Sequence, residues 1–189
     1  MSLYDQKWQK FLRRVWLFNF IPFVDFMLAA GSLATGNMNE DSDFDVIVGV
    51  TQNRIFTARA YCILAFWTFG WRAKHPNSPQ SPPLQYTVLL KWWHPWRDKV
   101  CLNHFVAPSA YRLSPPYNEY WENLYKNLVP VYGDAAVIQK FFDANADWLG
   151  QRRIYIEDER HIYRKKGIIA KIREYLLRGK FGDWVEEKL

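Results

Sequence analysis

The sequence of 189 residues contains only two cysteines, too few for a framework of disulfides. Cys62 and Cys101 lie within apolar stretches and lack the spacing of metal ligands. We therefore expect two buried, reduced thiols and a protein of the cytoplasm. A signal peptide is not expected either, because the first residues are polar and no cleavage pattern follows them.

Long apolar runs are also missing. The longest, at residues 15–30, is interrupted by Asn19, Pro22 and Asp25. A second run, at residues 60–71, is shorter than the roughly 20 residues that cross a bilayer. These two observations predict a soluble protein with no membrane partner.

Charge of one sign is only in modest excess, since 25 basic and 19 acidic side chains give a net charge of +6. A positive balance suits polyanionic partners such as nucleotides or RNA, but many basic domains have no such partner. Hydrophobic residues make up 49% of the chain and charged residues 23%, which excludes disorder over the whole length. Ten tryptophans predict a bulky core.

The order of apolar patterns predicts an α+β (α/β-like) domain with a helical C-terminal half. An amphipathic helix opens the chain and ends before Pro22, with a basic face that we expect to be solvated. We assign residues 1–150 to the domain and residues 151–189 to a basic helical extension. The expected strands lie at residues 24–30, 43–50, 86–90, 99–106 and 129–134, and the expected helices at 55–70, 117–127, 135–145 and 160–177.

The segment at residues 28–50, LAAGSLATGNMNEDSDFDVIVGV, carries the chemistry. Asp43 and Asp45 lie two residues apart on a β-branched strand, so both carboxylates leave the same face. Adjacent carboxylates repel each other unless a cation lies between them, and Mg²⁺ prefers carboxylates combined with phosphate oxygens. Upstream, Gly31 permits close backbone approach and Ser32 offers a hydroxyl where free N–H groups attract phosphate. The alternative is a solvated turn before a core strand.

These elements resemble the nucleotidyltransferase superfamily that includes DNA polymerase beta. The superfamily pattern is Gly-Ser, a polar stretch and then Asp-x-Asp, here Gly31, Ser32, Asp43 and Asp45. The resemblance is strongest to its minimal single-domain branch, which also contains antibiotic nucleotidyltransferases and antitoxin-like proteins. It covers residues 23–135 and implies the nucleotidyltransferase fold, a small mixed β-sheet flanked by helices.

The resemblance also implies an activity, a two-metal transfer of a nucleoside monophosphate from a nucleoside triphosphate to an acceptor hydroxyl. Asp43 and Asp45 would bind Mg²⁺, while Ser32 and the backbone near Gly31 would hold the β- and γ-phosphates. The metals would stabilise charge on the attacking and leaving oxygens. The acceptor stays open between a small molecule, a protein and RNA.

The sequence departs from the superfamily pattern at the third carboxylate, which lies on a neighbouring strand. That strand is best matched by residues 100–105, and Asn103 stands where the aspartate is expected. An amide oxygen can contact metal or nucleotide, but it cannot act as a base. His104 points to the opposite face of a regular strand, and Asp98 precedes the strand. A second hypothesis is therefore a catalytically weak or inactive nucleotide-binding, regulatory module on the same fold.

Two further segments allow functional interpretations beside simpler ones. Residues 92–96 (WWHPW) could stack on a base, or could pack beside a loop. The apolar stripe within residues 160–177 could pack on the domain or form a partner interface, and the basic side chains around it could bind nucleic acid. Those basic side chains are Arg160, Arg164, Lys165, Lys166, Lys171, Arg173, Arg178 and Lys180.

Overall fold

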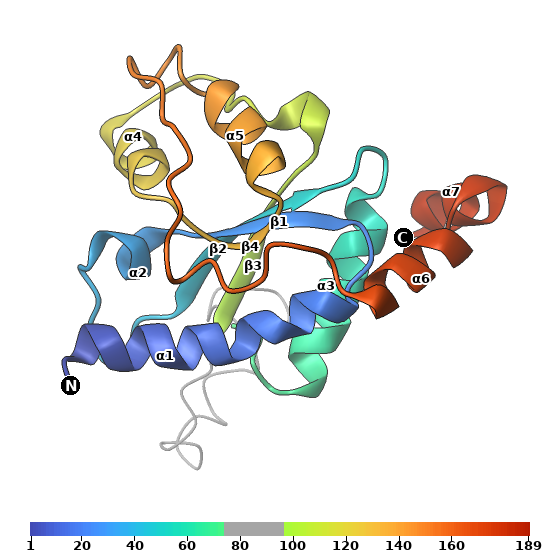
Figure 1. Cartoon of the computed structure of the whole chain (residues 1–189), viewed down its shortest axis with the longest axis horizontal. Coiled ribbons are helices and arrows are strands. Elements are labelled where there is room, and N and C mark those ends of the chain that lie inside the picture. Colours follow the sequence, from blue (N-terminus) through green and yellow to red (C-terminus); the bar gives the residue numbers. More distant parts are fainter. Residues whose placement is uncertain (74–96) are drawn as a thin grey trace, which may run out of the picture.

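The computed structural model describes residues 1–73 and 97–189, which form a mixed α+β fold (Figure 1). Within these residues four strands build one sheet in the order β3-β2-β1-β4. Strand β1 pairs antiparallel with both β2 and β4, whereas β2 and β3 run parallel. The strands are β1 (Val24–Ala29), β2 (Phe44–Val50), β3 (Val100–Val106) and β4 (Val129–Gly133).

Helices cover both faces of this sheet (Figure 1). One face is covered by α1 (Leu3–Val15), a 3₁₀ helix (Trp16–Phe20) and α3 (Ile55–Thr68). The other face is covered by α4 (Glu119–Lys126) and α5 (Ala135–Asp143). The remaining helices are the short α2 (Gly31–Thr35) between β1 and β2, a 3₁₀ turn (Pro108–Ala110), and the C-terminal α6 (Ile168–Leu176) and α7 (Gly179–Lys188).

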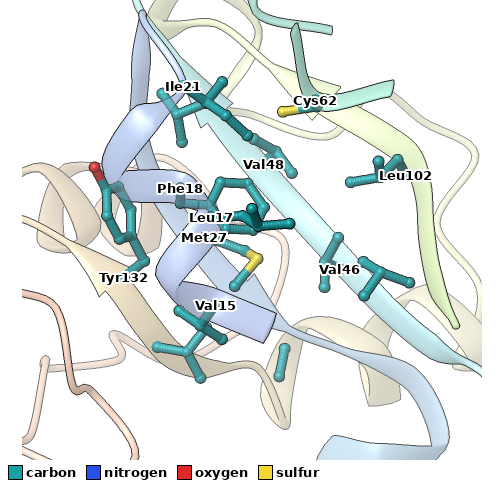
Figure 2. Packing of buried hydrophobic residues seen from close by; sticks show 14 of the residues in the cluster. Val15, Leu17, Phe18, Ile21, Met27, Val46, Val48, Cys62, Leu102 and Tyr132 are labelled. Atoms are coloured by element: carbon teal, nitrogen blue, oxygen red, sulfur yellow. The ribbon is translucent and has the colours of Figure 1, made fainter. Parts of the chain in front are cut away.

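Alternation along the strands sends side chains into two cores, one on each face. Val46 and Val48 of β2 pack with Phe18 and Met27 in the first core (Figure 2). Ile47, between them in the sequence, belongs to the second core beneath α4 and α5. Both faces of β2 are thus apolar in its second half, which leaves Asp45 and the adjacent Asp43 as the polar side chains at the start of the strand.

Most of the predicted elements in the described part of the chain are confirmed. The strands expected at residues 24–30, 43–50 and 99–106 match β1, β2 and β3 to within one residue at each end, and α3 lies within the helix expected at 55–70. The strand expected at residues 86–90 lies outside the described residues. In the described part of the chain, no helix combines the length and apolarity needed to span a membrane.

The continuous helix expected at residues 160–177 is wrong, because α6 begins only at Ile168. The preceding residues instead satisfy the backbone of β4: Gly133 donates its N–H to the Tyr163 carbonyl at 2.8 Å, and His161 Nε2 lies 2.8 Å from the Gly133 carbonyl oxygen. These tertiary hydrogen bonds compete with helical ones. Gly179, expected to end the helix, begins α7 with a φ of +71°.

The basic face of α1 is solvated only in part: Lys10 and Arg13 are exposed as expected, whereas Lys7 is buried. Lys7 is only 2% exposed, and its ammonium lies 2.8 Å from a carboxylate oxygen of Asp98. The same ammonium donates to the carbonyl oxygens of Glu40 at 2.7 Å and Ser42 at 2.9 Å. Burial opposes ionisation of Asp98, but hydrogen bonds from Lys10 and Lys7 lower its pKa below the usual 3.8. Lys7 therefore holds the loop that leads into β2.

Arg14 is likewise half-buried rather than solvated. Its guanidinium lies 5.4 Å from the ring centroids of both Phe44 and Trp71, and burial lowers its pKa. The arginine thus covers the first residue of β2 from the side of α1, and stacking on aromatic faces replaces part of its hydration.

Residues 151–189 are held against the sheet and α3 by polar contacts. Glu174 of α6, 7% exposed, accepts a hydrogen bond from the Phe23 N–H at 2.7 Å. Lys166 bridges Glu174 at 2.6 Å and Asp25 at 2.8 Å. From α7, Glu186 accepts hydrogen bonds from the N–H groups of Phe56 and Thr57, which begin α3.

Replacing Glu174 with alanine is expected to lower the free energy of unfolding by about 2–4 kcal/mol, because it leaves a buried amide and a partly buried ammonium without their carboxylate. Glu187→Ala, which removes an exposed carboxylate from α7, is the control and should change stability little. Urea unfolding followed by circular dichroism measures both. Equal losses in the two variants would contradict the role given to Glu174.

The Lys7–Asp98 pair makes stability depend on pH in a defined direction. Because the folded pKa of Asp98 is lowered, its stabilisation is present above the ordinary value of 3.8 and is lost as the pH falls through the folded pKa. Asp98→Asn should cost about 2–4 kcal/mol at neutral pH and make unfolding less sensitive to acid. Asp41→Asn, at an exposed loop position, should leave the pH profile unchanged in urea unfolding series.

Candidate metal and nucleotide site

The turn after β1 brings the glycine-serine corner against β2. The Ala30 N–H donates to the Asp45 carbonyl at 2.9 Å, and Gly31 then takes a φ of +59° as the first residue of α2. A Cβ built on Gly31 would lie 2.3 Å from Asp45 Oδ2. The Asp45 carboxylate therefore lies directly against the Gly31 backbone, and a side chain at position 31 would require the carboxylate to move.

Ser32 lies in the first turn of α2 and is half-buried. Its neighbour Leu33 is buried in the first core and anchors the short helix. Gly36, with a φ of +80°, then ends α2. This packing fixes the backbone of Ser32 in a short helix directly after the Gly31 corner rather than on a free loop.

Asp43 and Asp45 form the acidic side of the site. Asp43 immediately precedes β2 and Asp45 is its second residue, and both are half-buried. Phe44 between them belongs to the first core, so it points to the opposite face of the strand. The structure thus brings the two predicted carboxylates together beside the glycine-serine corner.

Cys101 is a member of the site that the sequence interpretation missed. It pairs with Asp45 across the parallel strands β2 and β3 and is 6% exposed. One oxygen of Asp43, one oxygen of Asp45 and the Cys101 Sγ all lie within 4.8 Å of one another. The predicted burial of Cys101 is confirmed, but the missing local spacing did not exclude metal ligation, because this group is assembled across two strands.

Strand β3 is irregular beside the site. Its register moves from Asp45 opposite Cys101 to Ile47 opposite His104, so that three steps along β3 match two along β2. His104 consequently packs near Trp121 of α4, with ring centroids 6.0 Å apart. The expectation that His104 lies on the far face assumed a regular strand and is wrong. Burial lowers the pKa of His104, which favours a neutral, packing ring.

Asn103 lies on β3 within this irregular stretch. Its side chain lies outside what the structure describes, so its contact with nucleotide stays a prediction. The residue opposite Asp45 in the strand register is Cys101.

The basic C-terminal segment is largely occupied by internal contacts. Arg160 pairs with Asp158 and Arg164 pairs with Glu157, while Arg173 donates to the Phe20 carbonyl. The basic side chains therefore do not lie on one continuous helix. Lys165, Lys171, Arg178 and Lys180 are nevertheless exposed, so binding of nucleic acid by this segment stays a prediction. The residues of the predicted WWHPW stacking cluster, 92–96, lie outside the described part of the chain.

The apolar stripe of α6 does not pack on the domain. The side chains that α6 buries are Ala170 and Glu174, whereas its large apolar residues face outward. Their exposed fractions are 76% for Ile168, 44% for Ile169, 54% for Ile172, 74% for Tyr175 and 64% for Leu176. Of the two alternatives for this stripe, packing on the domain is therefore wrong.

Three geometric features of this structure define the candidate site. They are two half-buried carboxylates, a buried thiol paired with one of them, and a glycine-serine corner against which that same carboxylate lies. Comparisons of the chain with protein-family models, curated proteins and solved structures gave no match.

Proposed function

We propose that this protein is a divalent-metal-dependent nucleotidyltransferase, which transfers a nucleoside monophosphate from a nucleoside triphosphate to an acceptor hydroxyl. The observation that carries the proposal is the close approach of the Asp45 carboxylate to the Gly31 backbone, with Asp43 beside it. Metal ligands and a phosphate-binding corner would then be adjacent, as the resemblance to the DNA polymerase beta superfamily implies.

The donor set fits a magnesium-triphosphate complex. Mg²⁺ is usually held by one or two carboxylates, while waters and substrate phosphates supply its other oxygens. Asp43 and Asp45 are half-buried rather than fully enclosed, so part of each residue remains accessible. The net charge of +6 also favours a polyanionic substrate.

The roles of the residues follow from their positions. Asp43 and Asp45 would hold the metal, which neutralises charge on the attacking and leaving oxygens during the displacement. The Ser32 hydroxyl and the backbone at Gly31 would donate hydrogen bonds to the β- and γ-phosphates. Asn103 would contact the nucleotide through its amide. The acceptor would be a small molecule, a protein or RNA.

Asp43→Asn and Asp45→Asn should each reduce nucleotide transfer by roughly 100-fold or more, the usual result of removing a main electrostatic contribution to the transition state. The measurement is pyrophosphate release, together with transfer of label from nucleoside triphosphates, in Mg²⁺ and with a panel of hydroxyl acceptors. Asp41→Asn, an exposed carboxylate two residues upstream, is the matched control and should keep full activity.

The same assay separates the two functional hypotheses. Metal-dependent nucleotide binding without turnover on any acceptor would support the catalytically inactive regulatory module. The proposed site would be contradicted if Asp43→Asn and Asp45→Asn both kept transfer activity, or if neither substitution changed nucleotide binding.

Gly31→Ala should disturb the site through a single added methyl group. Its Cβ would meet Asp45 Oδ2 at 2.3 Å, so the carboxylate must move, and metal-dependent nucleotide binding should weaken roughly 10–100-fold, as for displaced metal-ligand geometry. Gly150→Ala is the control, because Gly150 has a similar φ of +67° but open space around its Cβ position.

Both glycine substitutions should lower the free energy of unfolding by about 1–2 kcal/mol, since both place alanine in a left-handed conformation. Only Gly31→Ala should affect binding, measured by calorimetric titration with a triphosphate and Mg²⁺. Equal binding by the two variants would show that Asp45 does not need the Gly31 contact.

A further inference from the structure

The strand register places the Cys101 thiol beside the acidic pair, on the strand where the superfamily pattern directed attention to Asn103. Cys101 lies directly opposite Asp45 in the parallel β2–β3 pair. Its neighbours Val100 and Leu102 belong to the first core, so the Cys101 side chain leaves the other face of β3, toward the carboxylates. The thiol is therefore aligned with the acidic pair by two adjacent strands.

The spacing of the three side chains fits a single ion. Their ligand atoms all lie within 4.8 Å of one another, whereas ligands of a tetrahedral zinc ion with bonds of 2.0–2.3 Å lie about 3.5 Å apart. Side-chain rotations that move these atoms by about 1 Å would close the site. Three protein ligands would leave a fourth position open for water or a substrate oxygen, the arrangement of catalytic zinc sites.

The chemistry of the ligands discriminates between metals. Mg²⁺ is a hard ion that takes oxygen ligands, while thiolates favour softer ions such as Zn²⁺. Two carboxylates and a thiolate within 4.8 Å would carry three negative charges, and a tightly bound divalent cation offsets most of their mutual repulsion. A buried thiol, 6% exposed, also meets the metal in surroundings where water competes little.

We infer that Asp43, Asp45 and Cys101 together bind a transition-metal ion of the zinc class as the resident metal of the proposed nucleotidyltransferase site. This inference rests on the proposed function for the role of the site but not for its ligands. Binding transfers the Cys101 thiol proton to solvent and forms a metal–sulfur bond.

Cobalt(II) is the probe, because it replaces zinc and reports a thiolate ligand through a sulfur-to-cobalt charge-transfer band in the near ultraviolet. Reduced, metal-free protein titrated with Co²⁺ should develop this band up to one equivalent. Cys101→Ser should abolish the band and weaken Co²⁺ binding at least 10-fold. Cys62→Ala is the matched control, because Cys62 is the second cysteine and lies fully buried in α3, within the first core. It should retain the band.

Cys101→Asp tests metal choice without removing a ligand. The substitution replaces the thiol with a carboxylate. The ratio of Co²⁺ affinity to Mg²⁺ affinity should therefore fall at least 10-fold, while Mg²⁺ binding is kept or improved. Circular dichroism confirms that each variant is folded. A variant with an unchanged preference would show that the thiol does not select the ion.

The outcomes separate this inference from the proposed function. If Co²⁺ fails to bind, binds without the charge-transfer band, or keeps the band in Cys101→Ser, the inference is overturned, whereas Mg²⁺-dependent transfer through Asp43 and Asp45 could still be observed. If the band depends on Cys101 but no acceptor is labelled, the mixed-ligand metal site stands and the transfer activity fails.

Discussion

The antiparallel pairing of β1 and β2 is the constraint on which the candidate site depends. It continues past the end of β1 through the hydrogen bond from the Ala30 N–H to the Asp45 carbonyl. The chain must then turn away at Gly31, and the Asp45 carboxylate fills the space that a side chain there would occupy. The register of β1 against β2 therefore fixes the positions of both Gly31 and the Asp45 carboxylate. A shift of this register by one residue would send Asp45 to the other face of the sheet.

The opening helix supports this arrangement from the other side. The Lys7 ammonium binds the Ser42 carbonyl next to Asp43, and Asp98 at the approach to β3 neutralises it. One buried cation thus fastens the chain segments that lead into the two parallel strands of the site. A buried lysine is costly unless it is paired and hydrogen-bonded, and here those contacts hold the loop from which Asp43 emerges.

Much of the fold and half of the site could be predicted from local sequence signals. The β-branched run after Asp43 and the Gly31 turn are local features, and both were placed correctly. Lys7 was misassigned because periodicity cannot show a counter-charge that lies 91 positions away at Asp98. The residues before α6 escaped prediction for a related reason, since their hydrogen bonds with β4 exist only after folding.

The two cysteines show why composition and burial alone could not complete the site. Both are buried, and both were interpreted as core thiols. Cys62 is packed within the first core, where burial raises its thiol pKa and stabilises the neutral form. Cys101 is also buried, but it lies opposite Asp45. Its Sγ lies within 4.8 Å of one oxygen of Asp43 and one oxygen of Asp45. The pairing of β2 with β3 is what makes Cys101, and not Cys62, a candidate metal ligand. The pairing of two strands that are distant in the sequence cannot be recognised from the local spacing of residues.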